Sequence, residues 1–220
     1  MSTDPGTAKR ARFGDGRAVR GALRVHGAIV GAALVSVFVL APPAAARSHK
    51  SHEHHASAGD GPMRNFGVVW EHKLTRSGMP NEDSGWTWLR GQGVRSVVTF
   101  RRENDVDYAS LGFRNTLHIP LSKRIFPTEQ QAERFLSFIQ DSANQPVHIH
   151  CEAGRDRTGM MTALARYAVD GWPLERALAE ARTYRGGKDL EDVRVEWLRT
   201  WVASHPPGSA RLGPVKSTKP

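Results

Sequence analysis

Cysteine is almost missing from this sequence, since the 220 residues contain a single one, Cys151. A lone cysteine cannot form an intramolecular disulfide bond, which excludes the small disulfide-stabilised scaffolds. Aromatic residues are also few, at 8%, but a hydrophobic share of 39% suffices for the core of one domain. The thiol is therefore either a small buried apolar side chain or a reactive group, and its neighbours in the sequence decide between the two.

Acidic residues are fewer than basic ones, 22 against 31, which gives a formal net charge of +9. Part of the excess lies in residues 1–46, which hold six basic side chains and two acidic ones. The other basic residues are scattered and form no recognised nucleic-acid motif, so we expect no nucleic-acid partner. The positive charge instead suits anionic substrates.

Long apolar runs are missing with one exception, residues 27–41, which carry no charge. The run follows a basic segment and precedes Ala44-Ala45-Ala46, a pattern typical of a bacterial secretory signal peptide. Its roughly 15 residues are short for a membrane span, which needs about 20. We expect residues 1–46 to be cleaved and the protein to be exported, either to the periplasm or as a secreted protein. An uncleaved signal, with membrane contact, is the alternative.

Regular apolar periodicity is absent from residues 47–62 and 204–220, which are rich in Gly, Pro, Ser or His. They are predicted to be a disordered linker and a flexible tail on either side of one domain at residues 63–203. The linker holds a group of histidines: His49, His52, His54 and His55. Imidazoles suit zinc, copper or nickel, but a solvated spacer is the simpler interpretation.

Within residues 63–203, short apolar runs alternate with amphipathic helical patterns. The runs predict strands at residues 68–70, 73–77, 96–100, 117–121 and 146–150. The helical patterns predict helices at residues 82–91, after Thr128, at residues 158–170, after Pro173, and near residues 190–201. This order predicts an α/β domain with a central mixed, mainly parallel sheet flanked by helices.

Two details of these helices are specific enough to test. Thr128 is predicted to be an N-cap, with Gln131 as its capping-box partner. The last helix is predicted to bury one stripe of side chains: Leu190, Val193, Trp197 and Trp201.

His118 and His148 alternate with apolar neighbours on predicted strands, so we expect packed, hydrogen-bonded core histidines rather than ligands.

The segment from His150 to Gly159 reads HCEAGRDRTG and lies between a predicted strand and a predicted helix. Such a turn aims backbone N–H groups and the positive end of a helix at one spot, and Gly154 permits a tight backbone there. Cys151 in this surrounding is favoured as a thiolate. Arg157 offers a planar fork for two phosphoryl oxygens. The segment therefore predicts binding of a phosphate dianion and attack on its phosphorus.

The same segment resembles the signature of the protein tyrosine and dual-specificity phosphatase superfamily, which is His-Cys, five residues, then Arg and Ser or Thr. It is most similar to small bacterial members with an Ala-Gly-Lys-Asp-Arg-Thr-Gly loop, except that Arg155 replaces the Lys. The likeness extends back to residues 75–78 and 101–103. It implies a dual-specificity-phosphatase-like domain that needs no metal or other cofactor. The implied substrates are phosphorylated protein, phosphotyrosine above all, or phosphoinositide.

The resemblance also assigns a role to each residue of the segment. Cys151 attacks phosphorus and forms a phosphocysteine intermediate, which water hydrolyses. Arg157 and the loop N–H groups stabilise the developing charge. The phosphate-binding loop comprises Glu152, Ala153, Gly154, Arg155, Asp156 and Arg157. His150 supports the thiolate by hydrogen bonding, and the hydroxyl of Thr158 is placed to donate to it.

The leaving group needs a proton, which the family usually takes from an Asp on a separate loop. That loop would follow the predicted strand at residues 117–121, but residues 122–127 hold no carboxylate. Asp156 inside the cradle is the preferred general acid. Asp105 is the alternative, and Asp107 lies on the same loop as Asp105. The missing Asp also keeps open a second interpretation, a catalytically inactive phosphate-binding module.

Basic residues follow two of the predicted strands: Arg101, Arg102, Lys123 and Arg124. Because strand ends line the sites of α/β sheets, these residues either rim the pocket or are solvated surface. A basic rim would favour substrates with several phosphates, such as inositol phosphates. Sulfur transfer of the rhodanese type is a third interpretation, against which the Arg157-Thr158 ending argues.

Overall fold

The structure, a computed structural model, describes residues 62–212. The predicted signal peptide, residues 47–61 of the predicted linker and residues 213–220 lie outside the described residues. The elements follow in the order β1 (Gly67–Trp70), β2 (Leu74–Gly78), α1 (Asp83–Gly91), β3 (Ser96–Thr99), β4 (Asn115–His118), α2 (Glu129–Gln140), β5 (Val147–Cys151), α3 (Asp156–Ala168), α4 (Leu174–Thr183) and α5 (Asp192–Val202). Within this part of the chain, no helix is long and apolar enough to cross a membrane.

The strands form one sheet in the order β1-β2-β5-β3-β4. β1 pairs with β2 antiparallel, and the pairs β2–β5, β5–β3 and β3–β4 are parallel. The predicted mixed, mainly parallel sheet is therefore confirmed. β5 lies at its centre, and every one of its residues is buried.

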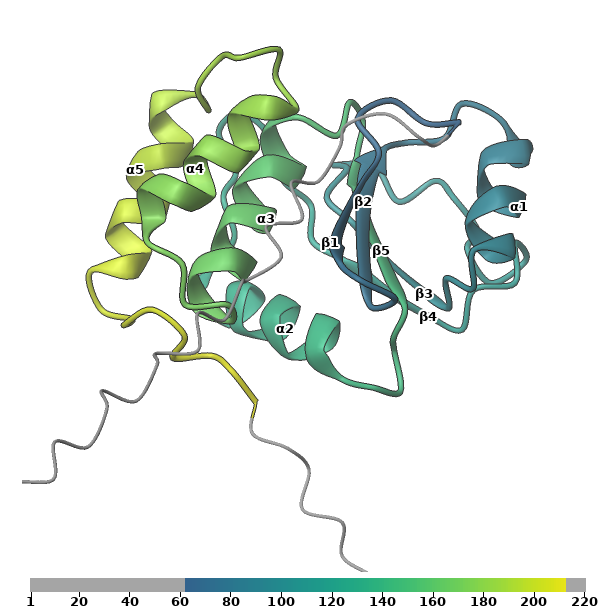
Figure 1. The fold of residues 1–220 in the computed structure, drawn as a ribbon. Helices are drawn as coiled ribbons and strands as arrows, with labels where there is room; N and C mark the ends of the chain where they lie inside the picture. The colour runs from purple at the N-terminus through teal and green to yellow at the C-terminus, as the bar shows by residue number, and fades with distance from the viewer. Residues whose placement is uncertain (1–61, 213–220) are drawn as a thin grey trace, which may run out of the picture. The chain divides into compact units, whose positions relative to one another are not determined.

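Helices cover both faces of the sheet: α1 lies on one side, and α2 to α5 lie on the other (Figure 1). Alternate residues of β5 point to the two sides, as the period of a strand requires. Ile149 and Cys151 join the core beneath α3, whereas the His150 ring lies 5.3 Å from the Trp86 ring of α1. His148 is also buried and hydrogen-bonded, at 2.9 Å to Thr75 and to Ser77, so the prediction of a core histidine is confirmed for it.

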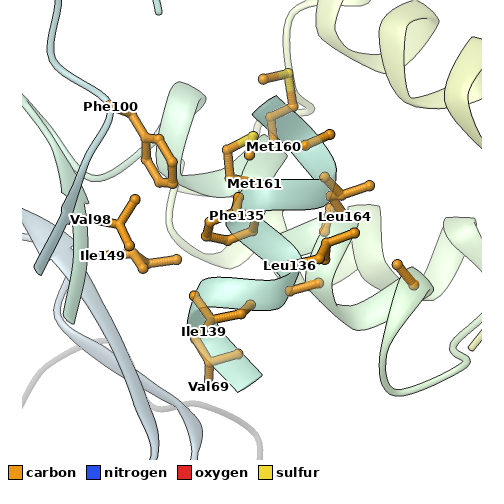
Figure 2. Close-up of a cluster of buried hydrophobic side chains, with 14 of the residues drawn as sticks. Val69, Val98, Phe100, Phe135, Leu136, Ile139, Ile149, Met160, Met161 and Leu164 are labelled. Carbon is orange, nitrogen blue, oxygen red and sulfur yellow. The ribbon is translucent and has the colours of Figure 1, made fainter. Parts of the chain in front are cut away.

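The larger core lies between the sheet and helices α2 and α3 (Figure 2). Side chains from both helices and from the strands meet there: Val98, Phe100, Phe135, Leu136, Ile139, Ile149, Met160, Met161 and Leu164. Burying each of the larger ones stabilises the fold by about 1.5–3 kcal/mol. Because β5 and α3 both contribute to this core, the end of the strand and the start of the helix are held in fixed places.

The N-terminus of α2 confirms the predicted capping box. The Thr128 hydroxyl accepts from the Gln131 N–H at 3.2 Å, and the Gln131 side chain accepts from the Thr128 N–H at 2.9 Å. These bonds satisfy two of the backbone donors involved in starting the helix.

Several boundaries differ from the sequence prediction, and two of them lie near Cys151 and Arg157. β4 ends at His118 rather than Leu121, because Ile119 makes the last ladder bond, 3.0 Å to Thr99, and Pro120 has no N–H. α3 begins at Asp156, two residues before Thr158, so Asp156 and Arg157 belong to its first turn.

The predicted inner stripe of α5 is partly wrong. Val193 is 53% exposed, and Leu190 is buried but precedes the helix. The buried positions are Arg194, Leu198 and Trp201. The predicted stripe has the wrong helical phase because it includes Leu190, which precedes the helix. The observed phase includes Arg194, and an arginine is not expected at a core position.

The predicted flexible tail does not begin at Ser204. Gly208 and Ala210 donate their N–H groups, each at 2.9 Å, to the carbonyls of Tyr167 and Ala168 at the end of α3. The Leu212 N–H donates to the Gln140 side chain at 2.9 Å. The last carbonyls of a helix have no partner within it, and this segment supplies one through a tertiary contact that composition does not reveal.

Candidate active site

Cys151 is the last residue of β5 and lies opposite Gly78 at the end of the neighbouring strand β2. Its thiol is free and only 2% exposed. Residues 152–155 turn the chain into α3, so the predicted strand–loop–helix order is confirmed. The thiol therefore lies at the carboxyl end of the parallel strands, where α/β sheets bind their ligands.

Gly154 is required by two features of the loop. Its φ is +67°, in the left-handed region that favours glycine. A Cβ at this position would also lie 2.3 Å from the Gly78 backbone nitrogen. The loop therefore packs directly on the end of β2, with no room for a side chain between them.

The carbonyl oxygens of the loop are anchored from outside it. Glu152 accepts from the Met79 N–H at 3.1 Å, Ala153 accepts from the Asn65 side chain at 2.8 Å, and Gly154 accepts from the Arg76 guanidinium. Two of these donors come from side chains more than 70 positions away in the sequence. No sequence motif pointed to a role for any of the three, although Arg76 lies in the segment 75–78 that carries part of the family resemblance.

The N–H groups of residues 152–155, by contrast, donate to no atom in the described part of the chain. Within a peptide plane, the C=O and the following N–H point in opposite directions. Anchoring the carbonyls of Glu152, Ala153 and Gly154 therefore turns the next three N–H groups the other way. Together with the start of α3, these donors form a cradle for an anion.

Arg157 reaches across the carboxyl ends of two other strands. Its Nη1 donates to the carbonyl of Phe100, after β3, at 3.2 Å, and to that of Leu121, after β4, at 3.3 Å. Its Nε and Nη2 atoms have no partner among the described residues. These two nitrogens form one edge of the guanidinium, the geometry that binds two oxygens of a phosphate.

His150 contacts the backbone of Cys151 rather than its sulfur. The Nδ1 atom lies 3.2 Å from the Cys151 carbonyl, and Nε2 lies 2.8 Å from the Tyr108 hydroxyl. Burial lowers the pKa of His150 from 6.5 to about 4, helped by the charges of Arg101 and Arg157. The ring is therefore neutral at pH 7. Because a carbonyl only accepts, the proton is on Nδ1, and Nε2 accepts from Tyr108.

The expected hydrogen bond from Thr158 to the thiol is not made in this structure. The Thr158 hydroxyl is buried and has no partner among residues 62–212. Its role as a donor to the thiolate remains a prediction.

The three candidate acids are all engaged by other groups. Asp156, whose side chain is 28% exposed, forms an ion pair with Arg185. Asp105 is bound by Arg101, whose hydrogen bond holds the pKa of that carboxyl below its usual value. The Ser110 hydroxyl donates to Asp107 at 2.6 Å and likewise lowers its pKa. Of the three, Asp156 alone belongs to the loop.

The basic residues after β3 and β4 differ in their surroundings. Arg101 is largely covered and lies 3.1 Å from Glu152, 3.9 Å from Glu103 and in contact with Asp105. Its charge is therefore already compensated. Arg102, Lys123 and Arg124 are exposed. Since Arg157 contacts the backbone at both Phe100 and Leu121, both basic segments begin beside the loop.

Among residues 62–212, one group outside the loop has metal-ligand chemistry. Glu129, Glu133 and His205 place their ligand atoms within 4.8 Å of one another. The His205 Nε2 lies 3.1 Å from a Glu129 oxygen, so a direct contact between these two side chains accounts for their closeness.

The fold and the loop together define a domain of the protein tyrosine and dual-specificity phosphatase type. A search of protein families matches residues 61–199 to the family described as "DSP-PTPase phosphatase fused to NAD+ Kinase". The match spans more than half of the chain, and the chain belongs to this family.

Similar curated proteins support this placement. The chain is 27% identical over 154 residues to the probable chloroplastic NAD kinase 2 of Oryza sativa, covering 66% of this chain and 15% of that protein. It is 32% identical over 123 residues to the dual specificity protein phosphatase TpbA of Pseudomonas aeruginosa, covering 55% of each. The chain thus spans about half or less of the length of these relatives.

Solved structures show the same fold. A TpbA variant crystallised with pTyr is 29% identical, with a TM-score of 0.51, over 68% of this chain and 96% of that one. The catalytic domain of the PP-IP phosphatase Siw14 of S. cerevisiae is 20% identical, with a TM-score of 0.56, over 65% and 88%. The second likeness concerns the fold alone.

Proposed function

We propose that this protein is a cysteine-dependent phosphatase that hydrolyses phosphomonoesters through a phosphocysteine intermediate. One observation carries the proposal. The thiol of Cys151 lies at the start of a loop whose carbonyls at residues 152–154 are tied back and whose N–H groups at residues 152–155 donate to no acceptor among the described residues. The unpaired edge of Arg157 adds a bidentate phosphate contact to this cradle.

In the first step, the Cys151 thiolate attacks phosphorus, and the bond from phosphorus to the ester oxygen breaks. The leaving oxygen takes a proton, and the phosphoryl group remains on sulfur. In the second step, water attacks phosphorus, the S–P bond breaks, and phosphate leaves. Throughout, the non-bridging oxygens are held by the loop N–H groups and by Arg157, which are in place before the reaction begins.

Asp156 is the proposed donor of the proton. It follows the cradle directly and occupies the first turn of α3, whereas Asp105 and Asp107 are held as carboxylates by their hydrogen-bond donors. In the structure, however, Arg185 contacts the Oδ1 atom of Asp156. Proton transfer therefore requires that Arg185 turn to another anion, for which the bound phosphate is suited.

Protein phosphotyrosine is the proposed substrate, and phosphoinositide is the alternative. The support is the complex of TpbA with pTyr, at 29% identity to this chain. The exposed Arg102, Lys123 and Arg124 near the loop are the feature that favours a substrate with several phosphates. Comparing kcat/KM for a phosphotyrosyl peptide and for soluble inositol phosphates separates the two.

A second candidate is a phosphate-binding module without turnover. The ion pairs of Asp105 with Arg101 and of Asp156 with Arg185 motivate it, because in the structure both carboxylates are occupied by an arginine. Such a module would still bind phosphate in the cradle.

The deciding experiment is hydrolysis of p-nitrophenyl phosphate by the purified chain in EDTA, beside its Cys151→Ser variant. Turnover that is lost in the variant supports the phosphatase. Equal rates in both proteins contradict it. Phosphate binding without turnover in the parent selects the second candidate.

We further propose that the protein is exported. The support is the uncharged run of residues 27–41, followed by Ala44-Ala45-Ala46. Mass spectrometry of the protein from a bacterial cell expressing the full gene product tests this. A mature chain that begins at Arg47 supports cleavage, and a full-length chain in the membrane fraction supports the anchored alternative.

A further inference from the structure

Arg76 is a buried cation whose position the proposed reaction does not explain. It lies in β2 and is paired with Ile149 of β5, and none of its surface is exposed. Burial lowers the pKa of Arg76 to about 10, against the opposing effect of charges on Tyr184, Glu180 and Cys151. The side chain is therefore still charged at pH 7, inside the protein.

No carboxylate pairs with this charge in the described part of the chain. The nearby Glu180 is already bound by Arg166, at 2.9 and 2.8 Å. Arg76 donates to the Gly154 carbonyl, and its guanidinium stacks 3.7 Å from the centre of the Tyr184 ring. Its Nε and Nη1 atoms have no partner among residues 62–212. An unpaired buried charge is costly, so this one requires a compensating anion or a role.

We propose that Arg76 is a positioning residue for the phosphate-binding loop, which it holds from behind while placing a second positive charge beneath the anion in the cradle. The proposal rests on the proposed function insofar as the loop is taken to bind phosphate. It assigns Arg76 no contact with the substrate.

The geometric part of this role follows from the peptide between Gly154 and Arg155. Holding the Gly154 carbonyl backward turns the Arg155 N–H toward the cradle. Glycine restrains its own backbone least of all residues, so this peptide needs an external anchor to keep one orientation. Arg76 supplies that anchor, and its full burial fixes its own position.

The electrostatic part follows from burial. A positive charge in a weakly screening interior acts over a longer distance than one in water. Behind the loop, it attracts the negative charge of an anion in the cradle. Arg157 acts on the same anion from the open side.

Tyr184 contacts the Arg76 guanidinium through its ring rather than through its hydroxyl. The hydroxyl is buried and has no partner in the described structure. A Cβ at Gly67 would be only 2.0 Å from this hydroxyl oxygen, so residue 67 must lack a side chain for the Tyr184 ring to lie there. Tyr184→Phe keeps the ring, and Tyr184→Leu removes it, which makes these two a matched pair.

The test uses the reactivity of the thiol, which is assigned without ambiguity because the chain has one cysteine. Alkylation by iodoacetamide is followed from pH 5 to 9, and protection by inorganic phosphate gives its affinity. The variants are Arg76→Met, Arg76→Lys, Tyr184→Phe and Tyr184→Leu. Arg194→Met is the control, since Arg194 is also buried, also donates to a backbone carbonyl, that of Ser122 at 3.3 Å, and lies on α5.

We expect Arg76→Met to lower phosphate affinity by about tenfold and the alkylation rate at pH 6 by roughly threefold or more. Arg76→Lys, which keeps the charge, recovers part of both losses. Tyr184→Phe matches the parent, and Tyr184→Leu falls between the parent and Arg76→Met. Arg194→Met loses stability, but its alkylation profile and phosphate affinity stay those of the parent.

A folded Arg76→Met variant with the parent's phosphate affinity and alkylation profile overturns the proposal. So does an equal loss in Arg76→Met and Arg194→Met, which is the result of a merely structural role. If Arg76→Met does not fold, Arg76→Lys and Tyr184→Leu decide by the same two measurements. Neither measurement needs turnover, so a parent that binds phosphate without hydrolysing esters contradicts the proposed function and leaves the role of Arg76 to these results.

Discussion

The phosphate-binding loop has a front, the side that faces the cradle, and a back, the side where its carbonyls are held. The two sides consist of different chemical groups. The front consists of the thiol of Cys151, backbone N–H groups and the free edge of Arg157. The back consists of donors that hold carbonyls: the Asn65 side chain, the Arg76 guanidinium and the Met79 N–H. The front holds the groups of the proposed chemistry and is encoded in one short segment. The back fixes the direction of the front, and its donors come from residues 65–79.

Substitutions on the two sides should therefore have different effects. Removing a group from the front removes charge stabilisation or proton transfer at the phosphorus atom. Removing a group from the back leaves every reacting group present but allows the peptides to turn. Front variants should therefore lose kcat, whereas back variants should lose phosphate affinity and stability first.

The largest expected effect is at Arg157. Arg157→Met removes the bidentate contact and should lower kcat by roughly 10³-fold, because charge stabilisation of this kind is the main catalytic contribution. Arg157→Lys should recover little, since an ammonium group cannot reproduce the fork. Steady-state kinetics with p-nitrophenyl phosphate measure both. A Lys variant near the parent's rate would show that a point charge suffices.

Asp156 comes next. Asp156→Asn should lower kcat by about 10²-fold for esters of alkyl alcohols and much less for esters with a good leaving group such as p-nitrophenol. The reason is that only a basic leaving oxygen needs a proton. The slope of log kcat against leaving-group pKa is the measurement, and Asp105→Asn is the matched control. A slope that is unchanged in Asp156→Asn but altered in Asp105→Asn reassigns the acid.

The histidine behind Cys151 should make stability depend on pH. The pKa of His150 is about 4 in the folded protein and 6.5 as its ordinary value, so the unfolded chain binds a proton first. Stability is therefore intact above pH 6.5 and is lost as the pH falls toward 4. The linkage relation gives a loss of about 2 kcal/mol between pH 7 and pH 5 from this residue alone.

Urea unfolding at pH 5, 6 and 7 measures this dependence. His148, whose pKa burial lowers well below 6.5, should add to it. His150→Asn should flatten the curve, and His72→Asn, at an exposed position, should not. A His150→Asn variant as steep as the parent would place the pH dependence elsewhere.

The smallest expected effect is at Asn65, on the back of the loop. Asn65→Gly keeps the positive φ of 55° but removes the 2.8 Å bond to the Ala153 carbonyl. A hydrogen bond of this kind contributes about 1 kcal/mol, so phosphate affinity should fall a few-fold with kcat nearly unchanged. Gln145→Ala removes a similar bond, to Ile139 at 2.9 Å, and serves as the control. A loss of kcat equal to that of Asp156→Asn would erase the distinction between front and back.

Much of the fold is predictable because its rules are local. The strand at β5 and the capping box at Thr128 depend on residues close in sequence, and both are found as predicted. The strand–loop–helix order around Cys151 is found for the same reason. The predicted stripe of α5 is partly wrong because Arg194 is buried. A charged residue in the sequence predicts an exposed position. The segment up to Leu212 was predicted as a tail because its Pro and Gly content hides its bonds to α2 and α3.

The class of the domain could be inferred from the sequence alone, as could the candidates for the nucleophile and the phosphate contact, because these residues lie within one run from His150 to Gly159. Tertiary structure decided which way the loop faces. Asn65 and Arg76 are 88 and 78 positions from the carbonyls they hold. The parallel pairing of β2 with β5 brings Arg76 there, and the 2.7 Å bond from the Gly78 N–H to the Arg64 carbonyl holds the chain beside Asn65 at the end of β2. No local pattern encodes a partner across that distance. Tertiary packing also pairs Asp156 with Arg185, and it leaves the Arg76 charge without a carboxylate among the described residues.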